Sequence, residues 1–177
     1  LLRGMGNSAH EREELIKLQD AFDAPYAWVF TSGGGRETKA RTAMGGAGRK
    51  GVITLMAELG GGGTVSKEIL ALTERGIRRM LHSIGMLPGY EADAMNGTRE
   101  LTITDSVIAY DNGLFEPFYD VEDVVKKGDS AGQIHFPEEP WREPKVLDFQ
   151  HGGMVLCKRV PGRVERGDCL FQVGSDL

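Results

Sequence analysis

The chain has 177 residues, of which 40% are hydrophobic and 27% charged, enough for one globular domain or two small ones. Its formal net charge of −5 argues against nucleic acid as a partner, because nucleic-acid binders concentrate basic residues on one face. No apolar run approaches the roughly 18 residues that span a membrane, and no signal-peptide pattern opens the sequence. We therefore expect a cytoplasmic protein that does not contact membranes.

The cysteine content and the first residues add two expectations. Cys157 and Cys169 are too few for a disulfide framework, and both lie in apolar, strand-like segments. They are expected to be reduced cysteines in the core. The sequence starts at Leu1 without an initiator methionine, so we expect a partial copy of a longer chain.

The first elements predict a mixture of helices and strands. Ser8 and Glu11 have the form of a capping box, which predicts a helix over 8–23. A short strand is expected at 26–30. The segment 31–51 is rich in glycine and basic residues and lacks apolar periodicity, so it predicts a long surface loop with about one helical turn.

The segment 52–59 is the most informative part of the chain. A short apolar run bounded by glycine predicts a buried, parallel strand that ends at Glu58. Open α/β sheets bind ligands at the carboxyl ends of their strands, so Glu58 is a candidate general acid or base. The alternative is a carboxylate that forms a cap or a salt bridge at the edge of the sheet.

Gly60–Gly63 follow this carboxylate and lead into a predicted helix over 66–84, capped by Thr64 or Ser66. The glycines also fit a phosphate site at a helix N-terminus, but neither a P-loop nor a dinucleotide-binding motif accompanies them. The helical spacing of its apolar residues predicts a buried face. This face consists of Ile69, Leu70, Leu72, Ile77, Met80, Leu81 and Ile84.

Beyond residue 99 the pattern changes to short, alternating runs separated by turns. Strands are predicted at 100–104, 107–110, 114–119, 133–136, 154–159 and 169–173. An internal repeat aligns 113–129 with 153–168, each copy having a strand, two valines expected to be buried, and a closing Gly-Asp turn. We therefore predict an α/β domain over 1–96 and a β-rich domain over 97–177.

The repeat resembles the two halves of a biotinyl/lipoyl-type barrel-sandwich hybrid. Lys145 lies between the copies, but it lacks the sequence setting of a carrier lysine and is more typical of a surface lysine. The chain as a whole resembles the C-terminal half of the succinylglutamate desuccinylase/aspartoacylase family, and in particular its N-acetyl-diaminobutyrate deacetylase branch. The resemblance rests on the motifs Ala57–Thr64, Glu74-Arg75-Gly76, Gly113–Pro117, His135-Phe136-Pro137 and Val164–Asp168.

The resemblance implies the end of a zinc-peptidase-like α/β domain followed by a β-rich, barrel-sandwich-like domain. It also implies a zinc-dependent amidohydrolase with one zinc per complete chain, acting on an N-acyl amino acid or a similar small amide. Glu58 matches the family's catalytic glutamate, which passes a proton from the zinc-bound water to the leaving amine. Arg49 and Arg41 are candidates for binding the substrate carboxylate, with solvated loop arginines as the alternative.

The family's zinc ligands lie upstream of the region matched here. None of the four histidines, His10, His82, His135 and His151, has the spacing of a zinc pair. His135 and His151 flank the segment between the repeats, where they could approach each other. We thus identify no metal ligand and expect the isolated chain to be inactive and to self-associate through uncovered apolar surface. The rival hypothesis is a non-catalytic binding or oligomerisation module.

Overall fold

The computed structural model describes residues 1–6, 8–30, 42–64 and 66–177, which divide into two compact units. The first unit comprises residues 1–101 and 177, and the second comprises 102–176. Strand β3 (Arg99–Ile108) contributes residues to both, so the predicted division into domains 1–96 and 97–177 stays a prediction. Among the described helices, none is long and apolar enough to cross a membrane.

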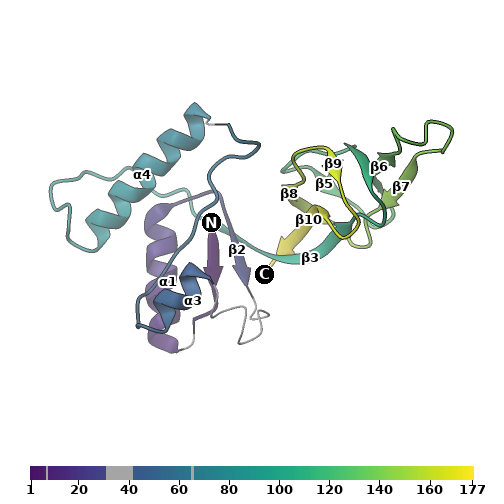
Figure 1. Cartoon of the computed structure of the whole chain (residues 1–177). Helices are drawn as coiled ribbons and strands as arrows, with labels where there is room; N and C mark the ends of the chain where they lie inside the picture. The colour runs from purple at the N-terminus through teal and green to yellow at the C-terminus, as the bar shows by residue number, and fades with distance from the viewer. Residues whose placement is uncertain (7, 31–41, 65) are drawn as a thin grey trace. The chain divides into compact units, whose positions relative to one another are not determined.

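The first unit contains a short parallel sheet covered by helices (Figure 1). Strand β1 (Leu2–Gly4) pairs with β2 (Tyr26–Phe30), which pairs with the first residues of β3. Helix α1 (Ala9–Phe22) connects β1 to β2 and begins as predicted, with the Ser8 hydroxyl accepting from the Glu11 N–H at 3.1 Å. Ala27, Val29 and Leu101 are at most 1% exposed and form the centre of this sheet.

The predicted strand at 52–59 is wrong. This segment makes one isolated bridge, between Met56 and Leu2, and the bridge is antiparallel. Its two hydrogen bonds, Leu2 N–H to Met56 O at 2.8 Å and Met56 N–H to Leu2 O at 3.3 Å, are too few for a ladder. Val52 is 52% exposed and Leu59 43%, so the apolar run is an extended surface segment.

Helix α4 (Lys67–Ser83) confirms the predicted helix and begins at Ser66, whose hydroxyl accepts from the Ile69 N–H at 3.2 Å. Its predicted buried face is wrong in part, because Leu70, Ile77 and Ile84 are 51%, 48% and 56% exposed. The buried residues are Gly76 and Arg79. A contact surface that depends on a glycine and an arginine has no apolar signature, which explains the error.

Helix α3 (Ala43–Gly48) lies in the predicted loop 31–51, where the sequence predicted about one helical turn. Thr42 caps it by accepting from the Gly45 N–H at 3.0 Å. The segment 31–41 lies outside the described residues.

The second unit is built from β-strands in two sheets that enclose one core (Figure 1). Besides β3, the strands are β4 (Gly113–Pro117), β5 (Val124–Val125), β6 (Ser130–His135), β7 (Lys145–Asp148), β8 (Gly153–Lys158), β9 (Arg163–Val164) and β10 (Cys169–Asp176). Their orders are β3-β10-β8-β5 and β7-β6-β4-β9. The core contains Phe115, Phe149 and Phe171, with neighbouring ring centroids 5.5–5.6 Å apart.

The short strand of each copy of the repeat pairs with a longer strand of the other copy. The short strand of the first copy, β5, pairs with β8 of the second, and β9 of the second copy pairs with β4 of the first. Each copy closes in the same turn, in which Asp129 accepts from the Lys126 N–H at 2.8 Å and Asp168 from the Glu165 N–H at 2.9 Å. Neither sheet closes into a barrel over the strands that the structure describes.

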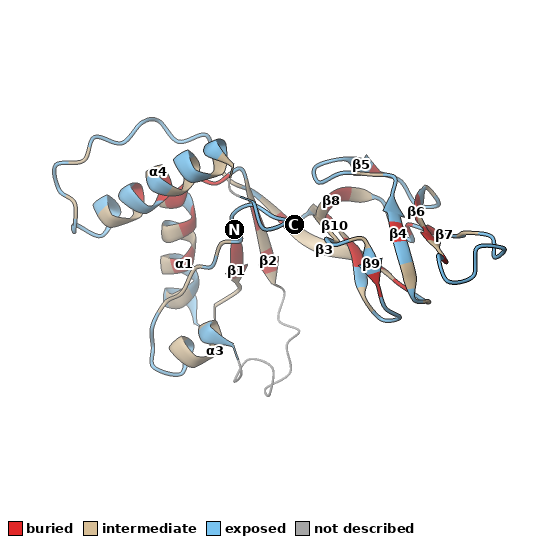
Figure 2. Ribbon diagram, turned by 45° about the horizontal axis from the view of Figure 1, so that its top comes forward, coloured by how far each residue is buried: buried red, intermediate tan, exposed pale blue. Residues whose placement is uncertain are grey.

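Of the two valines that align between the copies, only the second is buried in each copy. Val125 and Val164 are 2% and 1% exposed, whereas Val121 and Val160 are 50% and 57% exposed. The expectation that both valines are buried is therefore wrong for the first of each pair. Figure 2 shows buried residues in β4, β8 and β9: one each in β4 and β9, and two adjacent ones in β8.

Candidate functional site

Glu58 lies two residues beyond the bridge between Met56 and Leu2, and its side chain is exposed. Because this segment runs antiparallel to β1, Glu58 lies at the end where the parallel strands begin. The sequence-based argument placed it at the carboxyl end of the sheet, and that placement is wrong. Glu58 is nevertheless accessible and lies two residues before Gly60, where the glycine turn begins.

The glycine turn carries the chain from Glu58 into α4. Gly60, Gly62 and Gly63 have φ values of 89°, 62° and 72°, in the left-handed region that favours glycine. Thr64 closes the turn, because both its N–H and its hydroxyl donate to Gly61 O, at 3.2 and 2.9 Å. The backbone path accounts for these glycines without a bound phosphate.

Arg49 follows α3 and is exposed. The Val52 N–H donates to Ala47 O at 3.1 Å, which holds the start of the 52–58 segment next to α3. Five residues separate Val52 from Glu58, a span of at most about 20 Å for a fully extended chain. Figure 1 shows α3 and the start of α4 beyond opposite ends of β1. The structure thus does not bring Arg49 and Glu58 together, and Arg41 lies outside the described residues.

The histidines are dispersed. His10 is exposed near the start of α1, and the His82 ring lies 3.0 Å from Leu87 O at the end of α4. His151 is exposed, and its N–H donates to Asp105 at 3.0 Å. His135 contacts Glu116 at 2.6 Å. Among the described residues, no three His, Cys, Asp or Glu side chains form a group that could hold a metal ion.

A buried polar cluster in the first unit has no motif in the sequence. Arg3 is 3% exposed and donates to Gln19 at 2.7 Å and to Glu100 at 2.5 Å, and Gln19 also donates to Glu100 at 2.8 Å. These contacts join β1, α1 and β3. The sequence signals this cluster only by placing the basic residue Arg3 directly after Leu1 and Leu2, and this does not identify the partners of Arg3.

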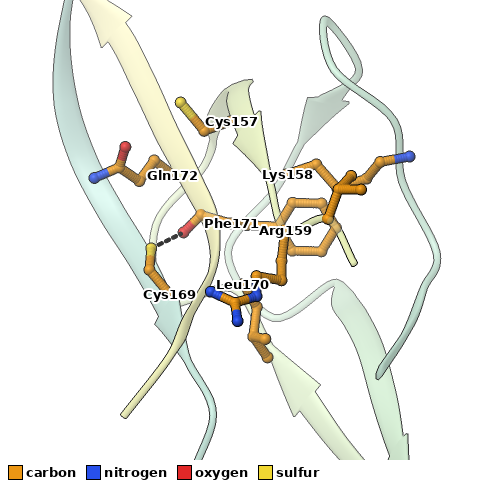
Figure 3. A pocket seen from close by; sticks show the side chains of 8 residues that line it. Cys157, Lys158, Arg159, Cys169, Leu170, Phe171 and Gln172 are labelled. Atoms are coloured by element: carbon orange, nitrogen blue, oxygen red, sulfur yellow. Dashed lines mark hydrogen bonds between the residues drawn. The ribbon is translucent and has the colours of Figure 1, made fainter. Parts of the chain in front are cut away.

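A hollow of about 290 Å³ lies over β8 and β10 (Figure 3). Its two positive charges are already paired, since Lys158 contacts Asp120 and Arg159 contacts Asp168 at 2.8 Å. The lining residues are Cys157, Lys158, Arg159, Val160, Cys169, Leu170, Phe171 and Gln172. Both cations thus have a carboxylate partner, although the buried Nε of Arg159 has no hydrogen-bond partner among the described residues.

The two cysteines of the hollow do not form a disulfide. Cys157 pairs with Gln172, three residues along β10 from Cys169, so the two α-carbons lie about 10 Å apart, beyond disulfide reach. Cys157 is half-buried and Cys169 is exposed. The expectation of core cysteines is therefore wrong for Cys169.

Comparison with known proteins finds clear relatives, although no protein-family profile matches the chain. The chain is 28% identical over 172 residues to the N-alpha-acetyl-L-2,4-diaminobutyric acid deacetylase of Halomonas elongata, which covers 96% of this chain and 49% of that protein.

Two solved structures extend this likeness. A succinylglutamate desuccinylase/aspartoacylase from Rhodobacter sphaeroides has a TM-score of 0.82 at 30% identity, covering 99% of this chain and 52% of the other. The product-bound ectoine utilization protein EutE (DoeB) of Ruegeria pomeroyi has a TM-score of 0.87 at 25% identity, covering 98% and 52%. The chain thus spans about half the length of the relatives it matches.

Proposed function

Since the chain is similar over nearly its whole length to proteins of the succinylglutamate desuccinylase/aspartoacylase family, we propose that it takes part in hydrolytic deacylation of a small N-acyl amino acid. The match of 172 residues to a deacetylase carries this proposal. The family fold further supports a zinc-peptidase-like α/β part followed by a barrel-sandwich-like part. A cytoplasmic location and association with further copies of the chain belong to the same proposal.

In this proposal Glu58 is the proton carrier. Its carboxylate takes a proton from the attacking water and delivers it to the leaving amine. Two observations support the role: the side chain is exposed, and the turn after it consists of glycines with no side chains to obstruct a substrate. Arg49 stays a proposed ligand of the substrate carboxylate, and this role requires its segment to approach Glu58 more closely than in this structure (Figure 1).

The family resemblance also implies a catalytic zinc, and the described residues do not fit it. They include no group of three His, Cys, Asp or Glu side chains that could hold a metal. Zinc in catalytic sites generally has three protein ligands. The chemistry proposed for this chain is therefore confined to Glu58, and the chain by itself is expected to be inactive.

The test compares Glu58→Gln with Glu91→Gln, a matched change at another exposed carboxylate of the first unit. Release of acetate from N-alpha-acetyl-L-2,4-diaminobutyrate is measured for the full-length gene product and for this chain alone. We expect Glu58→Gln to lower kcat at least 100-fold, the effect of losing a general base, and Glu91→Gln to leave it unchanged. Equal turnover in the two variants would remove Glu58 from the mechanism.

The rival proposal is a module that binds or assembles without catalysis. It predicts no acetate release from any N-acyl amino acid at any chain length. Activity in the full-length product that is lost in Glu58→Gln excludes the rival.

A further inference from the structure

Three polar side chains meet on the outer face of the sheet formed by β4 and β6. Glu116 pairs directly with Gln133 across the two strands, and His135 lies two residues further along β6. Paired residues, and residues two apart on one strand, project to the same side of a sheet. Phe115 and Ile134 point to the other side, where they are 4% and 0% exposed in the core. The rigid strands therefore hold all three polar groups on one surface.

Their terminal atoms form a small triangle. Oε2 of Glu116 lies 2.6 Å from Nε2 of His135 and 2.7 Å from Nε2 of Gln133, and the two nitrogens are 3.3 Å apart. The amide nitrogen and oxygen of Gln133 exchange places by a simple flip. Zinc bonds of about 2.1 Å place neighbouring ligand atoms about 3.0–3.4 Å apart. The triangle thus needs to expand by only a few tenths of an ångström to become one face of a zinc coordination sphere.

We propose that Glu116, Gln133 and His135 form a surface site for a divalent transition-metal ion such as Zn²⁺ or Ni²⁺. The ligands are Oε2 of Glu116, Nε2 of His135 and, after the flip, the amide oxygen of Gln133. Water completes the coordination sphere on the solvent side, since the side chains of His135 and Glu116 are 37% and 52% exposed. The site goes beyond the proposed deacylation and does not depend on it.

The proton balance of binding is simple. The metal replaces the hydrogen between Nε2 of His135 and Glu116, and in neutral imidazole this proton moves to Nδ1. Imidazolium must instead release one proton, so the metal and the proton compete for Nε2. In the metal-free protein, the hydrogen bonds from Gln133 and His135 lower the pKa of Glu116.

The donor set predicts the kind of metal. Imidazole nitrogen suits zinc, nickel and copper, whereas magnesium and calcium prefer oxygen ligands throughout. A site with one nitrogen and two oxygens should therefore bind Zn²⁺ and Ni²⁺ and discriminate against Mg²⁺ and Ca²⁺.

Calorimetric titration of the protein with Zn²⁺, Ni²⁺ and Mg²⁺ at pH 7.5 tests the site. We expect His135→Ala and Glu116→Gln each to weaken Zn²⁺ binding at least tenfold, and Gln133→Leu to weaken it about threefold. His151→Ala and Glu139→Gln change the same residue types at exposed positions of the second unit and should leave the affinity within twofold. Zn²⁺ binding that survives His135→Ala unchanged overturns the proposal, as does binding of Mg²⁺ as tight as that of Zn²⁺.

A measurement on the unmodified chain guards against variants that fail to fold. Zn²⁺ bound through Nε2 shifts the ring ¹⁵N resonances of His135 and leaves those of His151 in place. Shifts confined to other histidines overturn the site. Because the readout is binding and not turnover, failure of the deacylase proposal leaves this result intact.

Discussion

Asp20 lies next to the buried cluster of Arg3, Gln19 and Glu100, and its environment disfavours the ionised form. Partial burial raises the pKa of Asp20, although the residue is largely exposed, and the negative charge of Glu100 raises it further, against a smaller opposing effect of Arg3. The ionised form of Asp20 therefore lowers the free energy of unfolding at neutral pH. Arg3 and Glu100 are not suitable for this test, because they join β1, α1 and β3 and removing one partner of such a pair is strongly destabilising.

We expect Asp20→Asn to stabilise the protein slightly at pH 7. The folded pKa lies above the unfolded value near 4, so the ionised group destabilises the fold at higher pH. The gain should shrink as the pH falls towards 4, because Asp20 takes up its proton at a higher pH in the folded state than in the unfolded state. Urea midpoints at pH 7 and pH 4 measure this, with Asp93→Asn as the control. A lower midpoint at pH 7 for Asp20→Asn would contradict the assignment.

At the scale of the elements, one helix contact in the first unit and a pair of turns in the second can be tested by single substitutions. Helix α4 approaches α1 at Gly76, where an added Cβ would lie 2.8 Å from the ring of Phe22. Arg79 strengthens this contact by donating to Ala21 O at 3.0 Å and to Asp93 O at 2.7 Å. In the second unit the two Gly-Asp turns have equivalent hydrogen bonds in the two copies.

Gly76→Ala should destabilise the protein by about 1 kcal/mol. The clash with Phe22 costs about 1–3 kcal/mol, and the better helix propensity of alanine returns about 1 kcal/mol. Chemical denaturation measures the change. If the contact is the cause, Phe22→Leu combined with Gly76→Ala should lose less stability than the sum of the two single changes. Strict additivity would show that the two residues do not interact.

The two turns of the repeat predict a matched pair of effects. Gly128 and Gly167 have φ values of 89° and 98°, and an added Cβ meets nothing within 4 Å. Gly128→Ala and Gly167→Ala should therefore each cost about 1–2 kcal/mol from backbone strain alone. Gly89→Ala, where φ is not positive and the space is equally open, is the control and should cost less. Thermal unfolding of the three variants measures the difference.

At the scale of the whole molecule, a row of apolar side chains on α4 remains uncovered. Leu70, Ile77 and Ile84 are spaced seven residues apart and are 51%, 48% and 56% exposed. Contiguous exposed apolar surface favours association. This surface and the 52–59 segment belong to the first unit, whose sheet has only three parallel strands among the described residues.

We expect the purified chain to self-associate through this row. Ile77→Lys places a charge at its centre and should shift the population towards monomer in sedimentation velocity. Ser83→Lys adds the same charge at another exposed position of α4 and should have a smaller effect. Association that is unchanged in Ile77→Lys would place the interface elsewhere.

Local signals in the sequence were sufficient for several elements and for the family. The Ser8 and Ser66 caps, the strand at 26–30 and the family resemblance depend on neighbouring residues or on motifs, and they could be predicted. The strands β1, β5, β7 and β9 were missed, because runs of two to four residues carry little periodicity. Likewise, the contacts of Arg3 and Gly76 join residues that are distant in the sequence, so no local pattern identifies them.

By itself, the sequence determined the identity of Glu58 as a candidate proton carrier, its position before a glycine turn, and the deacylase resemblance. Only the tertiary structure decided which end of the sheet Glu58 occupies, that Arg49 lies away from it, and that Glu116, Gln133 and His135 converge. The reason is physical. Capping and turn chemistry act within a few residues, whereas strand direction and cross-strand neighbours depend on pairing between distant segments.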